Sequence, residues 1–225
     1  IRSFSEILVD TPNLDHERAE HFLSIIVRES ERLTRLIDDH LDLARLEAGH
    51  SDWRAVDVDP RTILDESVDA VKGLMDRKGV ILNTEFSRQT VMLHVDRDRL
   101  TQVFINLLSN AVKFSDPEHP TVLVRGEAID GGYLVSITDN GNGVPQNELE
   151  IIFDKFSRGG KYADDKPKPS GSGLGLAIAK HVVEHCQGKI WAESPPGQGA
   201  TFRVFIPGQV MEAIDAAKPE QLSIQ

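Results

Sequence analysis

Two asparagines and a lysine stand at helical spacing in the segment QVFINLLSNAVKFS. Asn106 and Asn110 are four positions apart and Lys113 follows within the next turn, so a helix places all three side chains on one face. A carboxamide oxygen is a hard ligand that suits Mg²⁺, and a lysine binds phosphate as a point charge. The group predicts a site for a metal and a phosphate, although solvated polar residues near a helix end show the same pattern.

A glycine-bearing turn follows an alternating segment at Thr138 to Pro145, TDNGNGVP. Gly141 and Gly143 permit backbone conformations and close approaches that residues with a Cβ resist, so a ligand can lie against the turn. Asp139, at the expected strand end, can accept a hydrogen bond from an exocyclic amine such as that of adenine. An Asp-Asn-Gly sequence is also a common hairpin turn, so an ordinary turn stays open as an explanation.

Two further motifs lie downstream. In IIFDKFSRGG, Phe153 and Phe156 stand ahead of Arg158 and two glycines, and the aromatic pair either anchors a loop or packs in the core.

GSGLGLAIAK, from Gly171 to Lys180, is a glycine-rich turn that runs directly into an expected helix. Backbone N–H groups at such a helix start bind anions. The motif lacks the Lys-Ser/Thr ending of a P-loop, so it predicts a phosphate site of another kind.

The elements that must position these residues begin with a helical hairpin. Apolar residues recur at three- and four-residue spacings before and after a break at Asp10 to Asp15, which predicts two helices. Asp15 is suited to cap the second helix, and Ala48-Gly49 to end it. One hairpin cannot bury so wide an apolar stripe, which predicts a homodimer with a four-helix bundle; packing on the chain's own second domain is the alternative. The stripe runs through Ile26, Leu33, Ile37 and Leu41.

An α+β domain is expected after the hairpin. Helical spacing over 61–78, 97–114 and from about 172 to 186 is interspersed with strand-like segments at 80–86, 90–96, 121–129, 133–139, 189–194 and 200–207. We divide the chain into a dimerisation hairpin at 1–52, a linker at 53–58, a catalytic domain at 59–208 and a tail at 209–225. The tail has a weak helical pattern from Val210 to Ala217.

Composition limits the partners and the compartment. The chain has 25 Lys and Arg against 36 Asp and Glu, a net charge of -11, which disfavours binding to nucleic acid or to an anionic membrane surface. The single cysteine, Cys186, fits a reducing compartment. No apolar run approaches the roughly 20 residues of a membrane helix, and the amino terminus lacks a signal-peptide layout. We expect a cytoplasmic chain, with any membrane attachment in a sensor region outside it, and proteins and small molecules as partners.

In their order along the chain, the four motifs resemble the N, first glycine, F and second glycine boxes of sensor histidine kinases. GQGATF, from Gly197 to Phe202, resembles the family's third glycine motif, and ESERLTRLIDDHLDLARLEAG is similar to its second dimerisation helix. The resemblance covers Ile1 to Pro207. It implies the GHKL (Bergerat) α/β sandwich shared with gyrase and mismatch-repair ATPases, ATP and Mg²⁺ as cofactors, a homodimer, and a response regulator receiver domain as partner.

The resemblance also implies a role for each matching residue. Asn110 is the expected Mg²⁺ ligand with Asn106 assisting, and Lys113 contacts phosphate. Asp139 binds the adenine amine, and Arg158 approaches the γ-phosphate under a flexible lid at 157–170. The other expected ATP-binding residues are Gly141, Gly143, Phe156, Gly171, Ser172, Gly173, Leu174, Gly175 and Thr201.

Asn106 distinguishes this chain from the hydrolytic relatives, which carry Glu at that position as a general base for water. Asparagine cannot take a proton, so the site is expected to transfer the γ-phosphoryl group to a nucleophile brought from elsewhere. In the family a histidine in a His-Glu/Asp-x-x-x-Pro box, just before a segment like IRSFSEIL, accepts the phosphoryl group and passes it to a response regulator Asp. None of the eight histidines of this chain lies in such a box, so no acceptor is assigned.

Two other functions stay open at this point. One is a pseudokinase scaffold that binds nucleotide and partner proteins without phosphotransfer, and the other is a free-standing GHKL ATPase, which Asn106 and the attached hairpin disfavour. Cys186-Gln187-Gly188 replaces the family's His-Gly-Gly after the last helix. His181, His185 and Cys186 have no further ligand nearby in sequence, which disfavours zinc.

Overall fold

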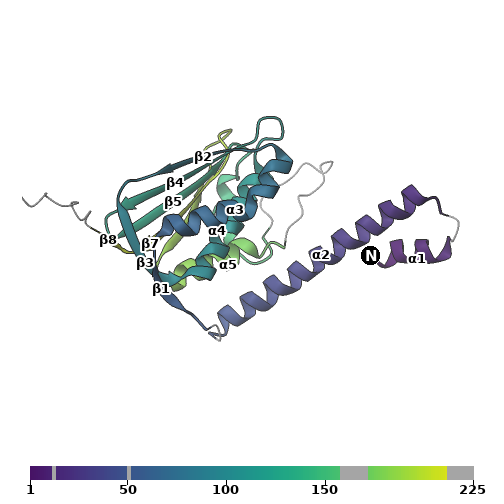
Figure 1. Cartoon of the computed structure of the whole chain (residues 1–225), viewed down its shortest axis with the longest axis horizontal. Coiled ribbons are helices and arrows are strands. Elements are labelled where there is room, and N and C mark those ends of the chain that lie inside the picture. The colour runs from purple at the N-terminus through teal and green to yellow at the C-terminus, as the bar shows by residue number, and fades with distance from the viewer. Residues whose placement is uncertain (12–13, 50–51, 158–171, 212–225) are drawn as a thin grey trace, which may run out of the picture.

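The computed structural model describes residues 1–11, 14–49, 52–157 and 172–211 (Figure 1). A helical hairpin extends from an α+β unit. The helices are α1 (Arg2–Asp10), α2 (His16–Glu47), α3 (Pro60–Lys78), α4 (Arg97–Phe114) and α5 (Gly175–His185), with short 3₁₀ helices η1 (Gln146–Glu148) and η2 (Ile151–Phe153). The strands are β1 (Ala55–Val58), β2 (Ile81–Phe86), β3 (Thr90–Asp96), β4 (Thr121–Ile129), β5 (Gly132–Asp139), β6 (Lys189–Glu193), β7 (Thr201–Pro207) and β8 (Gln209–Met211). The predicted fold class, a helical hairpin followed by an α+β domain, is confirmed.

Acidic caps begin three of the helices. Asp15 accepts a hydrogen bond from the backbone of Arg18 at the start of α2, Asp59 caps α3, and Asp96 accepts from the backbone of Arg99 at the start of α4. These carboxylates satisfy backbone N–H groups that have no partner inside the helix and interact favourably with the helix dipole. The helix starts therefore follow from the local sequence, as the Asp15 prediction assumed.

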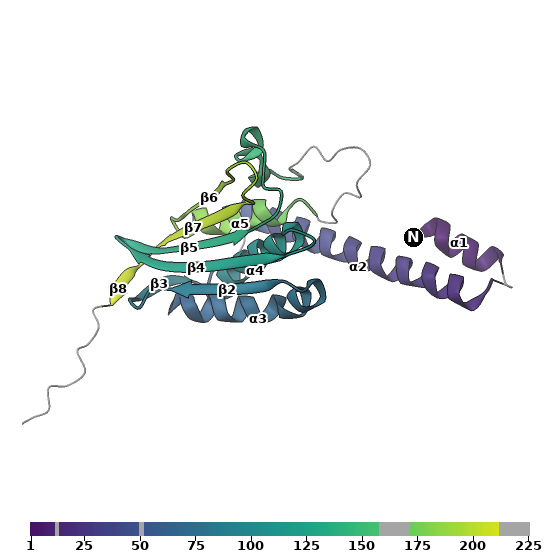
Figure 2. The same cartoon turned by 90° about the horizontal axis from the view of Figure 1, so that it is seen from above.

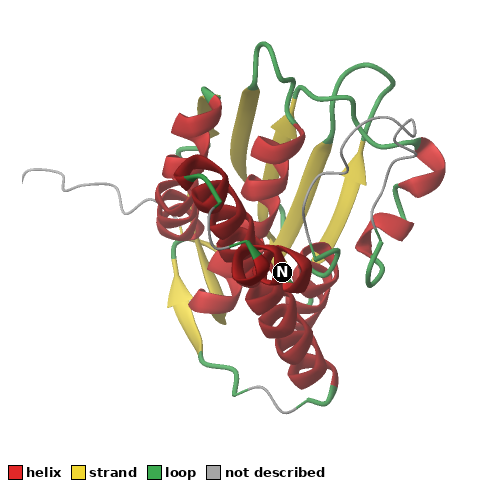
Figure 3. Cartoon of the chain, turned by 90° about the vertical axis from the view of Figure 1, so that its right-hand side faces the viewer, coloured by secondary structure: helices red, strands yellow, loops and turns green. Residues whose placement is uncertain are grey.

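The main sheet has five strands in the order β2-β4-β5-β7-β6. β2 pairs with β4 in parallel, and the other neighbours are antiparallel, including the hairpins β4–β5 and β6–β7. Helices α3, α4 and α5 lie on one face of this sheet (Figures 2 and 3). Alternate residues of β5 and β7, such as Val135, Ile137 and Val204, are buried under them, because successive side chains of a strand point to opposite faces.

A second, three-stranded sheet has the order β1-β3-β8. Both outer strands pair with β3 in antiparallel register. The sequence interpretation gave 53–58 to a linker and began the tail at 209, with a helical pattern from Val210. In the structure, β1 pairs with residues 93–96 of β3, and β8 pairs as a strand with residues 90–92. This pairing satisfies backbone groups of β3 that would otherwise be unpaired. The domain boundaries stay predictions, and the tail beyond residue 211 lies outside the described residues.

The end of α2 packs on the α+β domain, whereas its middle does not. Leu43 and Leu46 are buried, while Leu33, Ile37 and Leu41 are about half exposed. The end of α2 thus fits the alternative in which the stripe packs on the chain's own second domain. The exposed middle of α2 fits the alternative of a four-helix bundle. No described helix is both long and apolar enough to cross a membrane.

Candidate functional site

The first and fourth sequence motifs meet beside the start of α5. Asn106, on α4, donates a hydrogen bond from Nδ2 to the carbonyl oxygen of Gly175 at 3.3 Å. The carboxamide nitrogen of Asn106 is thereby engaged, which leaves its Oδ1 as an acceptor. Asn110 lies one turn further along α4, and both asparagine side chains are partly exposed. Two oxygen donors on one face of a helix, beside a glycine-rich turn, fit a hard divalent cation that also contacts phosphate.

The glycine-rich turn leads into a helix whose N terminus has no side-chain cap. The Leu174 backbone N–H donates to Ser172 Oγ at 3.2 Å, and the Gly173 carbonyl accepts from the Phe156 N–H at 2.9 Å. Leu174 is fully buried, so only its backbone is available to a ligand. The uncapped N–H groups at the start of α5 suit an anion.

Asp139 ends β5 with a carboxylate that is only 3% exposed. Its Oδ1 accepts a hydrogen bond from the Gly141 N–H at 2.9 Å. Burial raises the pKa of Asp139 above its ordinary value, and hydrogen bonds from the backbone of Gly141 and Ala200 partly offset the rise. A buried acceptor held by the backbone is suited to recognise a donor group of a ligand.

Two glycines allow the backbone segments around Asp139 to touch. A Cβ on Gly141 would lie 1.8 Å from the Phe114 carbonyl oxygen, and one on Gly199 would lie 1.9 Å from the Asp139 carbonyl oxygen. Gly199 also has a φ of +76°, which side chains disfavour. Contact between these segments brings the first and third glycine motifs together, with Asp139 between them.

Ser194 is a buried residue that the sequence interpretation missed. Its Oγ donates to the Gly199 carbonyl at 2.7 Å and accepts from the Val144 N–H at 2.8 Å, and it lies beside Gly143. The Ser194 carbonyl accepts from Gln146 Nε2 at 2.7 Å. Ser194 therefore ties both glycine turns to the end of β6. Its only signal in the sequence was a serine directly after an apolar strand.

Thr201 is the predicted site residue that the structure separates from the others. It pairs with Thr138 in the β5–β7 register, and the two hydroxyls are 3.0 Å apart. Because side chains alternate along a strand, Thr138 and Thr201 lie on the face opposite to Asp139. Ala200 contacts the site instead, since its carbonyl accepts from the Asp139 N–H at 2.9 Å.

Lys113 and Phe156 are two further residues of the predicted ATP site that the structure describes, whereas others lie outside the described residues. Lys113 Nζ lies 4.7 Å from the centroid of the Phe114 ring near the end of α4. Phe156 is 60% exposed and has a φ of +60°, an unusual backbone conformation for a bulky residue. Arg158, Gly171 and the predicted lid from residue 158 onward lie outside the described residues.

The two histidines of the possible zinc site have other contacts. His181 Nε2 lies 3.1 Å from the Leu46 carbonyl oxygen, and the His185 ring stacks on Trp53 with centroids 3.6 Å apart. Within the described ranges, no group of three or more His, Cys, Asp or Glu side chains is placed to hold a metal. Both histidines instead join α5 to the chain around the end of α2.

Two protein families match the chain in succession. One, described as "Histidine kinase-, DNA gyrase B-, and HSP90-like ATPase", matches residues 95–210, about half of the chain, and the other, described as "His Kinase A (phospho-acceptor) domain", matches residues 1–49. The chain belongs to the histidine kinase family. The matches confirm the predicted family and the order of a hairpin followed by an ATP-binding domain.

Known kinases resemble the chain along most of its length. The Sensor protein kinase WalK of Staphylococcus epidermidis is 33% identical over 213 residues, which are 94% of this chain and 34% of that protein. Full-length ShkA, in complex with AMPPNP, is 29% identical with a TM-score of 0.72 over 93% of this chain and 43% of ShkA. The histidine kinase ThkA, in complex with the response regulator TrrA, shares the fold at 20% identity, with a TM-score of 0.71 over 92% of this chain and 57% of ThkA. The chain thus spans about a third of the length of the curated relatives that it matches.

Asp139→Asn is expected to raise the free energy of unfolding of the nucleotide-free kinase at neutral pH. Because the pKa of Asp139 is raised from 3.8 in the folded state, the folded protein holds this proton more tightly than the unfolded chain. The wild type therefore loses stability as the pH rises from the unfolded to the folded pKa. Asparagine keeps an oxygen for the Gly141 N–H and carries no charge. Urea unfolding should show that the variant exceeds the wild type in free energy of unfolding by more at neutral than at acidic pH. An equal difference at both pH values would contradict the expectation.

Proposed function

We propose that this kinase binds Mg²⁺-ATP and transfers the γ-phosphoryl group to a histidine on the helix that precedes Ile1 in the full-length protein. A response regulator Asp then receives the phosphoryl group. The observation that carries the proposal is the junction of Asn106 with Gly175, because it joins the metal-ligand face of α4 to the anion-binding turn. The complex of the relative ShkA with AMPPNP, an analogue of ATP, supports ATP as the nucleotide.

The proposed roles follow from chemistry and position. Asn110 and Asn106 offer carboxamide oxygens to Mg²⁺, and the bound cation neutralises charge on the phosphate groups. Gly173 and Gly175, with the backbone of Leu174, surround the phosphates at the start of α5. Asp139 accepts a hydrogen bond from the adenine amine, and Lys113 contacts a phosphate.

Transfer to a protein side chain is favoured over hydrolysis because the site has no base at position 106. The Asn106 amide, with its nitrogen donating to Gly175, can orient a ligand but cannot accept a proton from water. Positioning and charge stabilisation remain as the sources of catalysis. No observation favours the pseudokinase scaffold or the free-standing ATPase.

A homodimer is the proposed assembly. Leu33, Ile37 and Leu41 expose an apolar stripe in the middle of α2, and stripes of this kind are buried in helical bundles. The pairing of ThkA with TrrA supports a response regulator as the second partner. We further propose that the catalytic region works in the cytoplasm, with any membrane anchor elsewhere in the full-length protein.

Nucleotide recognition is tested with Asp139→Asn and two nucleotides. Inosine triphosphate lacks the exocyclic amine of ATP, so the wild type should bind ATP at least about tenfold more tightly, the equivalent of one 1.4 kcal/mol interaction. Asparagine replaces one acceptor oxygen by a donor NH₂ group, so the variant should lose affinity for ATP and lose the preference. Calorimetry with Mg²⁺ measures the affinities of the wild type and of the variant for ATP and for inosine triphosphate.

Asn83→Asp is the matched control. Asn83 is exposed on β2, and this variant exchanges a carboxamide and a carboxylate away from the site, in the reverse sense of Asp139→Asn. Its ATP affinity should equal that of the wild type. Equal affinities of the wild type for both nucleotides would remove Asp139 as the adenine-reading residue, and no saturable binding of either would overturn the proposed function.

A further inference from the structure

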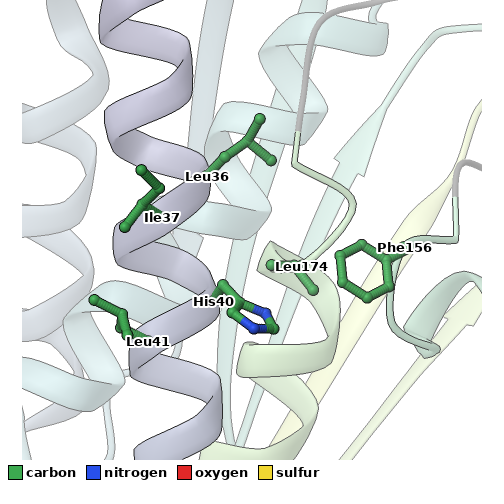
Figure 4. Close-up of a pocket in the computed structure, with 6 residues that line it drawn as sticks. All are labelled: Leu36, Ile37, His40, Leu41, Phe156 and Leu174. Atoms are coloured by element: carbon green, nitrogen blue, oxygen red, sulfur yellow. The ribbon is translucent and has the colours of Figure 1, made fainter.

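The two ends of the candidate nucleotide site have different surroundings. At the second glycine motif, Leu174 and Phe156 face the His40 ring of α2 across an apolar hollow of about 300 Å³ (Figure 4). At the first glycine motif, Asp139 is only 3% exposed and its carboxylate accepts from the Gly141 N–H. A group that recognises a ligand in one orientation needs fixed supports around it. Recognition by Asp139 therefore depends on what holds the neighbouring backbone in place.

Asn140 belongs to the first glycine motif and bonds the connection between α4 and β4 at three points. Its Oδ1 accepts from the Asp116 N–H at 3.2 Å and from the Thr121 N–H at 3.0 Å. Its Nδ2 donates to the His119 carbonyl at 2.7 Å. One side chain thus uses both ends of its carboxamide to bind a connection that lies 19 to 24 positions away in the sequence.

The connection itself is a compact turn that touches the first glycine motif. Asp116 Oδ1 accepts from the Glu118 N–H at 2.9 Å and from the His119 N–H at 2.8 Å, and the backbone bonds of His119 and Glu118 lower the pKa of Asp116. At its start, the Phe114 carbonyl oxygen would lie 1.8 Å from a Cβ on Gly141. Both residues that follow Asp139 are therefore in contact with this connection.

The end of α4 has a separate support. Lys78, at the end of α3, donates from Nζ to the carbonyl oxygens of Val112 at 3.1 Å and of Lys113 at 2.9 Å. A cation at this position satisfies carbonyl groups that have no partner inside the helix and interacts favourably with the helix dipole. Asn110 lies on α4, so its place is fixed without Asn140.

We propose that Asn140 is a positioning residue for adenine recognition. It holds the connection between α4 and β4 against the first glycine turn and thereby fixes the direction of the Asp139 carboxylate. The inference rests on the proposed function, in which Asp139 accepts from the adenine amine. A hydrogen bond weakens steeply when its donor and acceptor are misaligned. Release of the turn therefore weakens recognition of the base, while Asn110 keeps its place beside the phosphate end of the site.

Asn140→Ala in the full-length kinase tests this role. The variant loses all three bonds, so the KM for ATP should rise by about three- to tenfold; the upper limit is the whole contribution of the adenine hydrogen bond. The KM for inosine triphosphate, which lacks the amine, and the kcat should keep their wild-type values. A merely structural role would instead reduce the fraction of active protein, which lowers kcat and changes neither KM. Autophosphorylation rates over a range of each nucleotide measure these constants.

Asn142→Ala is the matched control, because it removes the same side chain two positions further along the same turn, where Asn142 is exposed. It should keep all wild-type values. Asn140→Asp is the second variant, for the case that Asn140→Ala does not fold. It keeps an oxygen for the Asp116 and Thr121 N–H groups, and an ionised acceptor strengthens such bonds, but it has no donor for the His119 carbonyl. The KM for ATP alone should again rise.

Hydrogen exchange at the Asp116 and Thr121 amides reports on the contact itself. Exchange should be faster in Asn140→Ala than in the wild type and in Asn142→Ala. Unchanged exchange, an unchanged KM for ATP, or an equal rise in KM for both nucleotides would overturn the proposal. A wild type without preference for ATP would also overturn it, yet would leave phosphoryl transfer in place. A wild type that neither binds nucleotide nor labels itself would overturn the proposed function.

Discussion

Replacing Asn110 with alanine is expected to abolish autophosphorylation of the full-length kinase. Mg²⁺ would lose a protein ligand while the fold loses only a partly exposed polar side chain. Charge stabilisation by a catalytic metal contributes several kcal/mol, so the rate should fall by roughly a hundredfold or more. Radiolabelled ATP measures the rate, and the acid-labile, base-stable phosphorus–nitrogen bond identifies histidine as the acceptor.

Asn83→Ala provides the comparison for this variant, because it makes the same substitution on the exposed side of β2. It should label at the wild-type rate. Nearly normal labelling of Asn110→Ala would show that the metal is held by other groups. Loss of labelling together with a lowered unfolding temperature would indicate a structural effect, which circular dichroism detects.

Gly199→Ala is expected to destabilise the ATP-binding domain and to disrupt nucleotide binding. The added Cβ would lie 1.9 Å from the Asp139 carbonyl oxygen, so the β5 end must move, and Asp139 moves with it. Overpacking of this kind costs about 1–3 kcal/mol, in addition to about 1–2 kcal/mol for a side chain at positive φ. Urea unfolding measures the loss of stability, and calorimetry measures the loss of ATP affinity.

Gly197→Ala separates the two costs. Gly197 has nearly the same φ, +74° against +76°, yet a Cβ there would meet nothing within 4 Å. Gly197→Ala should therefore show only the conformational cost and should bind ATP normally. If both variants were equally stable and bound ATP equally well, the close contact between Gly199 and Asp139 would not be important for the site.

Local signals in the sequence were sufficient to predict most of the secondary structure. Asp15 caps α2 as expected, and the spacing of Asn106 and Asn110 placed both on α4. The β4–β5 hairpin follows from Asp130-Gly131-Gly132, where Gly131 has a φ of +78°. Each of these features depends on a few neighbouring residues, which is why a single sequence contains them.

Features that depend on contacts between distant segments were missed. The pairing of β8 with β3 joins residues more than a hundred positions apart, and no local pattern indicates it. Thr201 was included because it belongs to a recognised motif, although strand alternation directs it away from Asp139. Ser194 connects two turns by hydrogen bonds that become visible only when β6 and β7 are paired.

The register of the second sheet sets the direction in which a pull on its two outer strands acts on their hydrogen bonds. β1 enters beside Asp96 at one end of β3, and β8 leaves beside Thr90 at the other end. A pull between α2 and residue 211 therefore acts along the strands in opposite directions. Because inter-strand hydrogen bonds run perpendicular to antiparallel strands, the bonds on each side of β3 are sheared together and do not open one by one. Tension applied to the two outer strands of this sheet is therefore expected to load their hydrogen bonds in shear.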